Sequence, residues 1–274
     1  MLTLTPSWIQ SARRLLPVFF MVIGMLFPAI GNAQEKNTEP KKNLKYASTT
    51  SLSLVLTHGN KEDFSFSLDT DQNLEFHKNR INFKGRFIVS SSNGEKTAEI
   101  YYSQLKFDRK IKSRAYLLGF ARYERNKLSG YLFRIALSAG AGISWTKGPK
   151  HQLTSELAFG WNNERENQRN AVNGLCPQSQ VCEQILSSSF LASIMTHKWV
   201  GQISESAKIV LQETLFWNLE ELKDIRLNSY FEISSSINRH LGLKTSFQVI
   251  YERQPVASYK STDIFILSSL VLQF

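Results

Sequence analysis

The sequence contains little that could hold a cofactor or a metal ion. It has only two cysteines and five histidines in 274 residues, and the histidines are isolated from one another. Two thiolates alone do not complete a zinc shell. The glycines of "SAGAGISW" lie in an alternating segment rather than between a strand and a helix, so they do not form a phosphate-binding loop. We therefore expect no cofactor and no metal site.

Long apolar runs and helical periodicity are also lacking beyond the N-terminal region. The one apolar run there, "LLPVFFMVIGMLFPAI", follows Arg13 and Arg14 and precedes the small residues of "GNA". It is shorter than the ~20 apolar residues that a membrane-spanning helix requires. We interpret residues 1–33 as a secretory signal cleaved near Ala33, with a transmembrane anchor as the less favoured alternative.

The chain has no cluster of bases interleaved with aromatic residues, although it is basic overall. Its 33 lysines and arginines exceed its 23 acidic residues by ten. The bases are spread singly through alternating segments, which argues against a nucleic-acid partner. Excess positive charge suits anionic lipid head groups or anionic solutes instead. Residues 34–44 are polar and show no periodicity, so we expect a disordered periplasmic leader there.

What the rest of the chain does contain is a period of two. In "DFSFSLDTDQNLEF", the apolar residues from Phe64 to Phe76 share one parity, and Ser65, Ser67, Asp69, Asp71, Asn73 and Glu75 share the other. The segments "GYLFRIALSAGAGISW", "IRLNSYFEISSSIN" and "LKTSFQVIYE" repeat the pattern, with Tyr131 in the apolar set of the first. Such alternation predicts strands with one apolar and one polar face.

Turn signals divide residues 45–274 into about twelve strands, with ten or fourteen as the alternatives. The connections after every second strand are mostly short, and the longest connection, residues 164–186, follows an odd-numbered strand. Short periplasmic turns, longer external loops and periplasmic termini are typical of outer-membrane barrels. The predicted strands are 46–57, 63–76, 80–91, 97–108, 113–124, 129–145, 151–163, 187–198, 206–217, 224–237, 241–252 and 262–274.

Two water-soluble folds are the alternatives to a membrane barrel. A soluble sandwich has about a hundred residues per domain and buries its apolar faces against each other. A lipocalin-like barrel has fewer and shorter strands than this chain offers. The chain offers about twelve strands with long apolar faces and no helix to cover them. If these strands close into a barrel with the apolar side toward lipid, every backbone group is paired and every apolar face meets lipid. We predict an all-β fold, a single antiparallel transmembrane β-barrel in the outer membrane of a Gram-negative bacterium.

The C-terminal segment "ILSSLVLQF" carries a second membrane signal. Leu270, Leu272 and Phe274 share one face, and an aromatic at this rim would lie in the aromatic girdle. The segment resembles the assembly signal that the barrel insertion machinery reads. It departs from that signal at Ser269, where glycine is usual, and at Leu267, where a polar residue is usual. The expected partners are the insertion machinery and outer-membrane lipid.

Several segments together resemble a known family. They are "LSLVLTHGNKEDFSF", "YLLGFARYERNKLSGYLFRIALSAGAGISW", "FWNLEELKDIRLNSYFEISSSINRHLGLKTSFQVIYERQP" and "TDIFILSSLVLQF". Together they are similar to the family of salt-induced outer-membrane proteins, whose biochemical function is uncharacterised. The resemblance spans nearly all of residues 44–274 and implies a single outer-membrane β-barrel. It implies no substrate and no catalytic residue.

The polar faces predict a charged lumen. Lys84, Arg86, Arg122 and Arg134 lie on neighbouring predicted strands and would form a basic wall for small anionic solutes. The alternative is that acids and bases pair across the lumen and brace the barrel. The other predicted lumen charges are Asp69, Asp71, Glu75, Glu156, Arg226, Glu232, Lys244 and Glu252.

Two further hypotheses compete with a small-solute channel or an envelope-stress barrel. One is a closed barrel that acts structurally or through its external loops, with a disulfide between Cys176 and Cys182 worth about 2 kcal/mol. The other, less favoured, is a lipid-modifying enzyme with Ser92 as nucleophile. A serine nucleophile requires a histidine base close by, and His58 is the one candidate at the same rim. We expect no catalysis.

Overall fold

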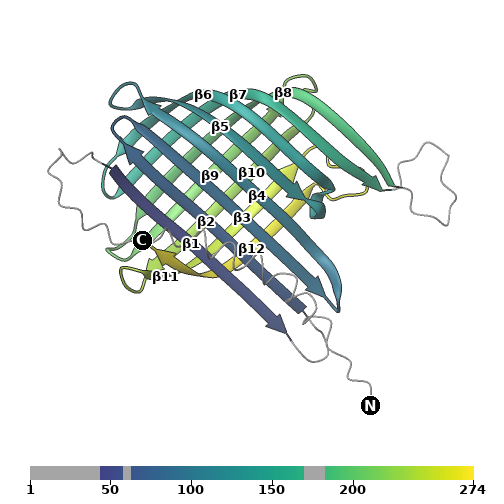
Figure 1. The fold of residues 1–274 in the computed structure, drawn as a ribbon, viewed down its shortest axis with the longest axis horizontal. Coiled ribbons are helices and arrows are strands. Elements are labelled where there is room, and N and C mark those ends of the chain that lie inside the picture. The colour runs from purple at the N-terminus through teal and green to yellow at the C-terminus, as the bar shows by residue number, and fades with distance from the viewer. Residues whose placement is uncertain (1–43, 58–62, 170–182) are drawn as a thin grey trace, which may run out of the picture.

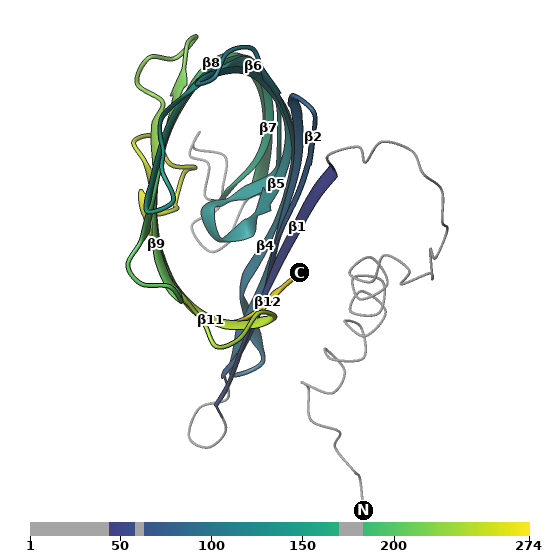
Figure 2. The same cartoon turned by 90° about the vertical axis from the view of Figure 1, so that its left-hand side faces the viewer.

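The structure, a computed structural model, describes residues 44–57, 63–169 and 183–274. Twelve antiparallel strands form a closed barrel in which each strand pairs with its neighbours in sequence and β1 pairs with β12 (Figure 1 and Figure 2). The predicted fold class and the number of strands are confirmed. The strands are β1 (Leu44–Thr57), β2 (Asp63–Phe76), β3 (Asn79–Ser92), β4 (Glu95–Lys110), β5 (Ala115–Asn126), β6 (Tyr131–Lys147), β7 (His151–Arg169), β8 (Glu183–Gln202), β9 (Ala207–Asn218), β10 (Ile225–Ser236), β11 (Leu241–Glu252) and β12 (Thr262–Gln273).

The single helical element is a short 3-10 turn, η1 (Lys127–Ser129), within the described residues. Among the described residues, no helix is long and apolar enough to cross a membrane. We use "periplasmic end" for the end of the barrel where β1 begins and β12 ends, and "external end" for the opposite one.

The outward face of the barrel is apolar. Large aliphatic and aromatic side chains alternate with inward polar residues and remain exposed. Because every strand has a partner on both sides, the closed sheet pairs most of its backbone and leaves these side chains for lipid. Examples are Leu105, Phe107, Leu117, Leu137, Phe159, Leu191, Met195, Leu211, Leu215 and Phe247. Together with the closed sheet, this face identifies a transmembrane barrel.

The long connection predicted at residues 164–186 is shorter than expected. β7 continues to Arg169 and β8 begins at Glu183, and Glu164 pairs in register with Ser188. The residues added to β7 are all polar, and those added to β8 place Ile185 and Leu186 next to each other, so neither segment alternates. Cross-strand pairing extends this hairpin beyond the apolar band, where both faces meet water.

The predicted outward position of Tyr131 is wrong. The register of β6 with β7 shifts between Tyr131 and Phe133, which is a β-bulge. A bulge adds one residue to one strand and turns the following side chains to the opposite face. Tyr131 consequently lies inside the barrel with 1% of its surface exposed.

Two glycines allow β6 and β7 to approach each other closely. A Cβ atom at Gly140 would lie 2.0 Å from the carbonyl oxygen of Leu157 and 2.6 Å from the Cα atom of Ala158. At Gly160, the nearest atom would be the carbonyl oxygen of Leu137 at 2.2 Å. Both contacts involve backbone, which cannot move aside without bending a strand.

We expect Gly140→Ala to destabilise the barrel by at least about 1–3 kcal/mol, the usual cost of overpacking. Gly148→Ala is the matched control, because its Cβ atom would meet only an ordinary contact of 3.5 Å with His151. Urea unfolding of the refolded barrels in detergent, followed by gel mobility with and without heating, measures the difference. Equal midpoints for both variants would contradict the close approach.

Candidate functional site: the barrel lumen

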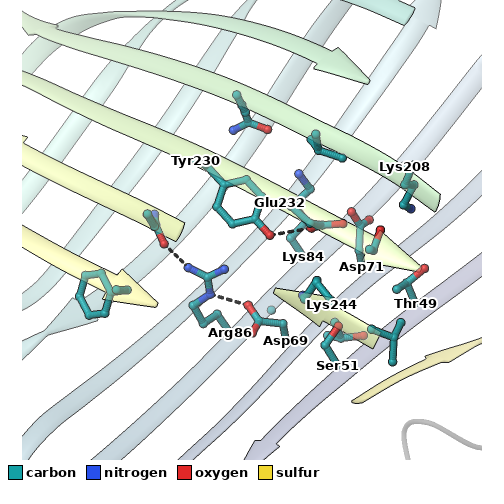
Figure 3. A pocket seen from close by; sticks show the side chains of 18 of the residues that line it. Thr49, Ser51, Asp69, Asp71, Lys84, Arg86, Lys208, Tyr230, Glu232 and Lys244 are labelled. Atoms are coloured by element: carbon teal, nitrogen blue, oxygen red, sulfur yellow. Dashed lines mark hydrogen bonds and ion pairs between the residues drawn. The ribbon is translucent and has the colours of Figure 1, made fainter. Parts of the chain in front are cut away.

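A polar cavity of about 390 Å³ lies inside the barrel (Figure 3). At the periplasmic end it is lined by Gln202 and Glu205, near the turn between β8 and β9, and by Gln273. Toward the external end its lining reaches Glu124 and Asn126 of β5. The cavity therefore extends from the periplasmic rim through much of the barrel.

Charged side chains of both signs line this cavity. Six bases and five acids contribute to its lining, so that their formal charges sum to one positive charge. The bases are Lys84, Arg86, Arg122, Lys198, Lys208 and Lys244, and the acids are Asp69, Asp71, Glu124, Glu205 and Glu232. Four of these, Glu124, Lys198, Glu205 and Lys208, were not predicted from the sequence.

The two arginines of the cavity are held by polar partners. Arg86 forms an ion pair with Asp69 and donates a second hydrogen bond to Gln248 (Figure 3). Arg122 donates to Gln104 Oε1 from Nε at 3.1 Å and from an amino nitrogen at 3.0 Å. These contacts fix the guanidinium groups against the wall.

The four lysines of the cavity have no ion pair within 4.0 Å among the described residues. Lys84, Lys198 and Lys208 line the same cavity, and the carboxylates of Asp71 and Glu232 line it with them. Lysines without a paired carboxylate leave ammonium donors available to an anion in the lumen.

A dense cluster of side chains fills the lumen above the cavity, and we call it the external cluster: Tyr131, Arg134, Glu164, Asp224, Arg226 and Glu252. Arg134 lies 2.6 Å from a carboxylate oxygen of Glu252 and 3.5 Å from Glu164. Arg226 holds Glu164 through two hydrogen bonds of 2.5 and 2.9 Å. Such two-pronged arginine–carboxylate contacts are among the strongest polar contacts in proteins.

The tyrosine and the aspartate of the external cluster complete it. The guanidinium carbon of Arg134 lies 3.1 Å from the centre of the Tyr131 ring, and the Tyr131 hydroxyl donates to Glu252 at 2.9 Å. Arg226 also contacts Asp224 at 2.7 Å. Within the cluster, each guanidinium therefore contacts two carboxylates and lies near the Tyr131 ring, which makes the cluster rigid.

The external cluster separates two cavities. Glu124 lines the large cavity and lies 3.8 Å from Arg134. On the other side, Glu164 and Arg226 line a second cavity of about 270 Å³ together with Gln254 of the loop after β11. A solute that crossed the barrel would have to pass between these side chains.

A second ion-pair group lies on the lumen wall at the periplasmic end. Lys106 contacts Glu156 at 2.5 Å and Asp108 at 3.6 Å, and Asp108 also pairs with Arg80. The Tyr116 hydroxyl donates to Glu156 at 2.6 Å. This group is balanced in charge and braces β3, β4, β5 and β7.

The predicted lumen residues divide among these three places. Lys84, Arg86 and Arg122 of the predicted basic wall line the cavity, whereas Arg134 belongs to the external cluster. The remaining predicted charges Asp69, Asp71, Glu232 and Lys244 line the cavity, Arg226 and Glu252 belong to the external cluster, Glu156 lies in the periplasmic group, and Glu75 lies 3.8 Å from Lys110.

The residues of the other hypotheses show no catalytic arrangement in the described part of the chain. The Ser92 hydroxyl bonds to a carboxylate oxygen of Asp63 at 2.5 Å, with no described histidine as its partner. His58, Cys176 and Cys182 lie outside the described residues. Within those residues, no group of three or more metal-binding side chains could hold a metal ion.

Comparisons with known proteins match most of the chain. A family profile described as "Protein of unknown function, DUF481" matches residues 50–274. "Uncharacterized protein YdiY" of Escherichia coli (strain K12) is 22% identical over 248 residues, which cover 88% of this chain and 90% of the relative.

Three solved structures are similar at low identity. The NanC porin is 8% identical, with a TM-score of 0.44, over 83% of this chain and 97% of that chain. The translocator domain of the autotransporter NalP from Neisseria meningitidis is 12% identical, with a TM-score of 0.44, over 94% and 96%. An outer membrane channel from Pseudomonas putida F1 is 8% identical, with a TM-score of 0.47, over 89% and 99%. No activity follows from likeness at these values.

Proposed function

The chain belongs to the DUF481 family of proteins of unknown function, and we propose from its lumen that it is a narrow outer-membrane conduit for small polar solutes, with a preference for anions. The observation that carries this proposal is the cavity that extends inward from the periplasmic rim. Its four lysines lack ion pairs among the described residues, whereas Asp69 is neutralised by Arg86. Available ammonium groups along a polar path favour small anions.

The rest of the chain has roles that agree with this proposal. Residues 1–33 direct export across the inner membrane of a Gram-negative bacterium and are removed near Ala33, and the predicted leader, 34–44, is the periplasmic segment that leads into β1, whose first residue is Leu44. The insertion machinery recognises the segment with Leu270, Leu272 and Phe274. The protein carries out no chemistry on its solutes.

We expect the refolded mature protein to conduct ions in a planar bilayer, with a reversal potential in a salt gradient that indicates anion preference. Neutralising Lys84 and Lys198 together should move the reversal potential toward cation selectivity, because Asp71 and Glu232 then dominate that part of the lumen. Lys112→Ala, in the exposed turn between β4 and β5, is the control and should leave the reversal potential unchanged. An unchanged reversal potential in the double variant would contradict the proposed preference for anions.

A closed barrel is the second candidate function, and the external cluster favours it. Across the lumen, Arg134 of β6 contacts Glu252 of β11, and Arg226 of β10 contacts Glu164 of β7. A barrel braced in this way would act structurally or through its external loops. Absence of conductance from a correctly folded barrel, judged by its circular dichroism and gel mobility, would replace the conduit with this second function.

A further inference from the structure

The wall of the barrel is paired over only part of its height between β1 and β12. Four register pairs, from Thr49 with Gln273 to Leu52 with Leu270, join these strands. Every other neighbouring pair of strands has at least eleven register pairs. Residues 53–57 and 262–269 therefore have no register partner across this join, as far as the structure describes the chain. We call this unpaired stretch the β1–β12 opening; it lies in the external half of the wall.

The middle of the β1–β12 opening is apolar on both faces of the wall, whereas Ser53, Thr57, Asp263 and Ser269 give its two ends polar inward side chains. Val55, Phe265 and Leu267 have the inward parity, and Val55 is 52% exposed. Four outward aliphatic side chains flank the opening and are 60–68% exposed: Leu54, Leu56, Ile264 and Ile266. A strand edge without a partner does not occur in direct contact with the hydrocarbon, so such backbone at membrane depth must be covered or must line a water-filled cavity. The opening thus has the character of a passage between the lumen and the lipid.

A row of lysines and serines lies on the lumen wall below the opening. In register across neighbouring strands, Lys208 pairs with Ser234, Ser234 with Lys244, and Lys244 with Ser269. We call these four residues the Lys–Ser row. Continuing the register of β1 with β12 by one residue would place Ser53 opposite Ser269, so the row ends at the foot of the opening.

The Lys–Ser row offers donors that have no acceptor. The hydroxyl groups of Ser234 and Ser269 are buried without a hydrogen-bond partner in the described residues, and Ser269 is only 6% exposed. Lys208 and Lys244 have no ion pair in the same part of the chain. Buried polar groups without a partner are rare in proteins, and a water molecule or a ligand supplies the missing acceptor in many of them. The row is therefore suited to an anionic group.

Apolar side chains join the cavity lining between this row and the opening. Toward the external end the lining includes Ile88, Ile100, Ile250 and Phe265 beside the polar Arg122, Glu124 and Asn126, whereas Lys208 and Lys244 lie near the periplasmic rim. Its volume of about 390 Å³ falls within the range of about 300–1,000 Å³ that is usual for small-molecule sites. A ligand that matches both ends has one anionic head and one hydrocarbon chain.

We propose that the lumen binds a single-chain anionic amphiphile, with its head on the Lys–Ser row and its chain directed through the β1–β12 opening into the membrane. This proposal rests on the proposed conduit, through which the anionic head would enter the lumen. It adds the chemical class of the ligand. Small anions without a chain would use the same lysines but would gain nothing from Phe265 and Leu267.

The first experiment tests the opening with two engineered cysteine pairs. Ser51 and Val271 form a register pair, so cysteines at these positions should form a disulfide readily. Val55 and Leu267 would pair only if the register continued through the opening, so cysteines there should remain reduced under the same oxidant. Peptide mapping distinguishes these bridges from one between the native Cys176 and Cys182. Equally rapid disulfide formation in both pairs would show that β1 and β12 continue their register past Leu52, and there would then be no opening.

The second experiment measures binding of nitroxide-labelled stearate to the folded barrel in phosphatidylcholine vesicles by electron paramagnetic resonance. An immobilised spectral component should appear, and Lys208→Ala with Lys244→Ala should weaken binding about tenfold, which corresponds to about 1.4 kcal/mol. Lys112→Ala should bind as the wild type does. The labelled methyl ester, which lacks the charge, should bind weakly.

The outcomes separate this inference from the conduit. Conductance without an immobilised component would overturn the amphiphile and leave the conduit intact. Full competition by inorganic phosphate at the affinity of stearate would also overturn it, because the chain would then contribute nothing. Stearate binding that depends on both lysines, in a barrel without conductance, would support the ligand and reject the conduit.

Discussion

Arg134→Ala is expected to raise the single-channel conductance severalfold and to shift selectivity toward cations. The Arg134 side chain occupies the boundary between the two lumen cavities, where it contacts Glu124, Glu164 and Glu252. Alanine removes the bulk that blocks this boundary. The change also leaves Arg226 as the one guanidinium facing the carboxylates of the external cluster. Single-channel recording in a planar bilayer, with a salt gradient, measures both effects.

Arg134→Ala should also destabilise the barrel by about 3–5 kcal/mol, because Glu252 would remain buried without its guanidinium partner. Arg80→Ala is the matched control. It also removes an arginine from an ion pair in the lumen, with Asp108, but Arg80 lines neither cavity. Its conductance should stay at the wild-type level. A similar rise in both variants would show that the external cluster does not limit passage.

The sequence predicts which side of each strand faces the lumen more reliably than it predicts contacts. Period-two alternation places Arg134, Arg226 and Glu252 inside, and they are buried there. The partners follow from closure of the barrel, since Arg134 and Glu252 are 118 residues apart. No local pattern reports such a distance. Whether Arg134 lines a wall or blocks a path is therefore decided by the tertiary structure.

Local irregularity accounts for the other differences. A bulge turns Tyr131 inward, although its parity in the sequence matches the outward set. Lys198 and Lys208 were missed because the alternation of β8 and β9 is less regular, with Glu213 in an otherwise apolar register. The departures at Leu267 and Ser269 from the usual assembly signal were visible in the sequence. They acquire a meaning only when the structure places both at the β1–β12 opening.

Deletion of residues 272–274 is expected to prevent the barrel from closing. Besides the four register pairs of β1 with β12, Ser48 and Phe274 exchange two backbone hydrogen bonds of 2.9 Å. These contacts make five residue pairs between β1 and β12. The deletion removes Phe274, Gln273 and Leu272, and with them three of the five pairs. The other neighbouring strands would lose almost nothing. We expect refolding in detergent to give little or no heat-modifiable, β-rich species.

Phe274→Ala separates closure from recognition by the insertion machinery. This substitution keeps the backbone hydrogen bonds to Ser48 and removes only the ring, whose centre lies 5.5 Å from that of His240. It should therefore refold in detergent almost as the wild type does, because no machinery is present. In cells it should lower the amount of protein in the outer membrane, because the aromatic is what the machinery would read. Normal refolding of the deletion variant would contradict the importance of the short join, since the barrel would then close without it.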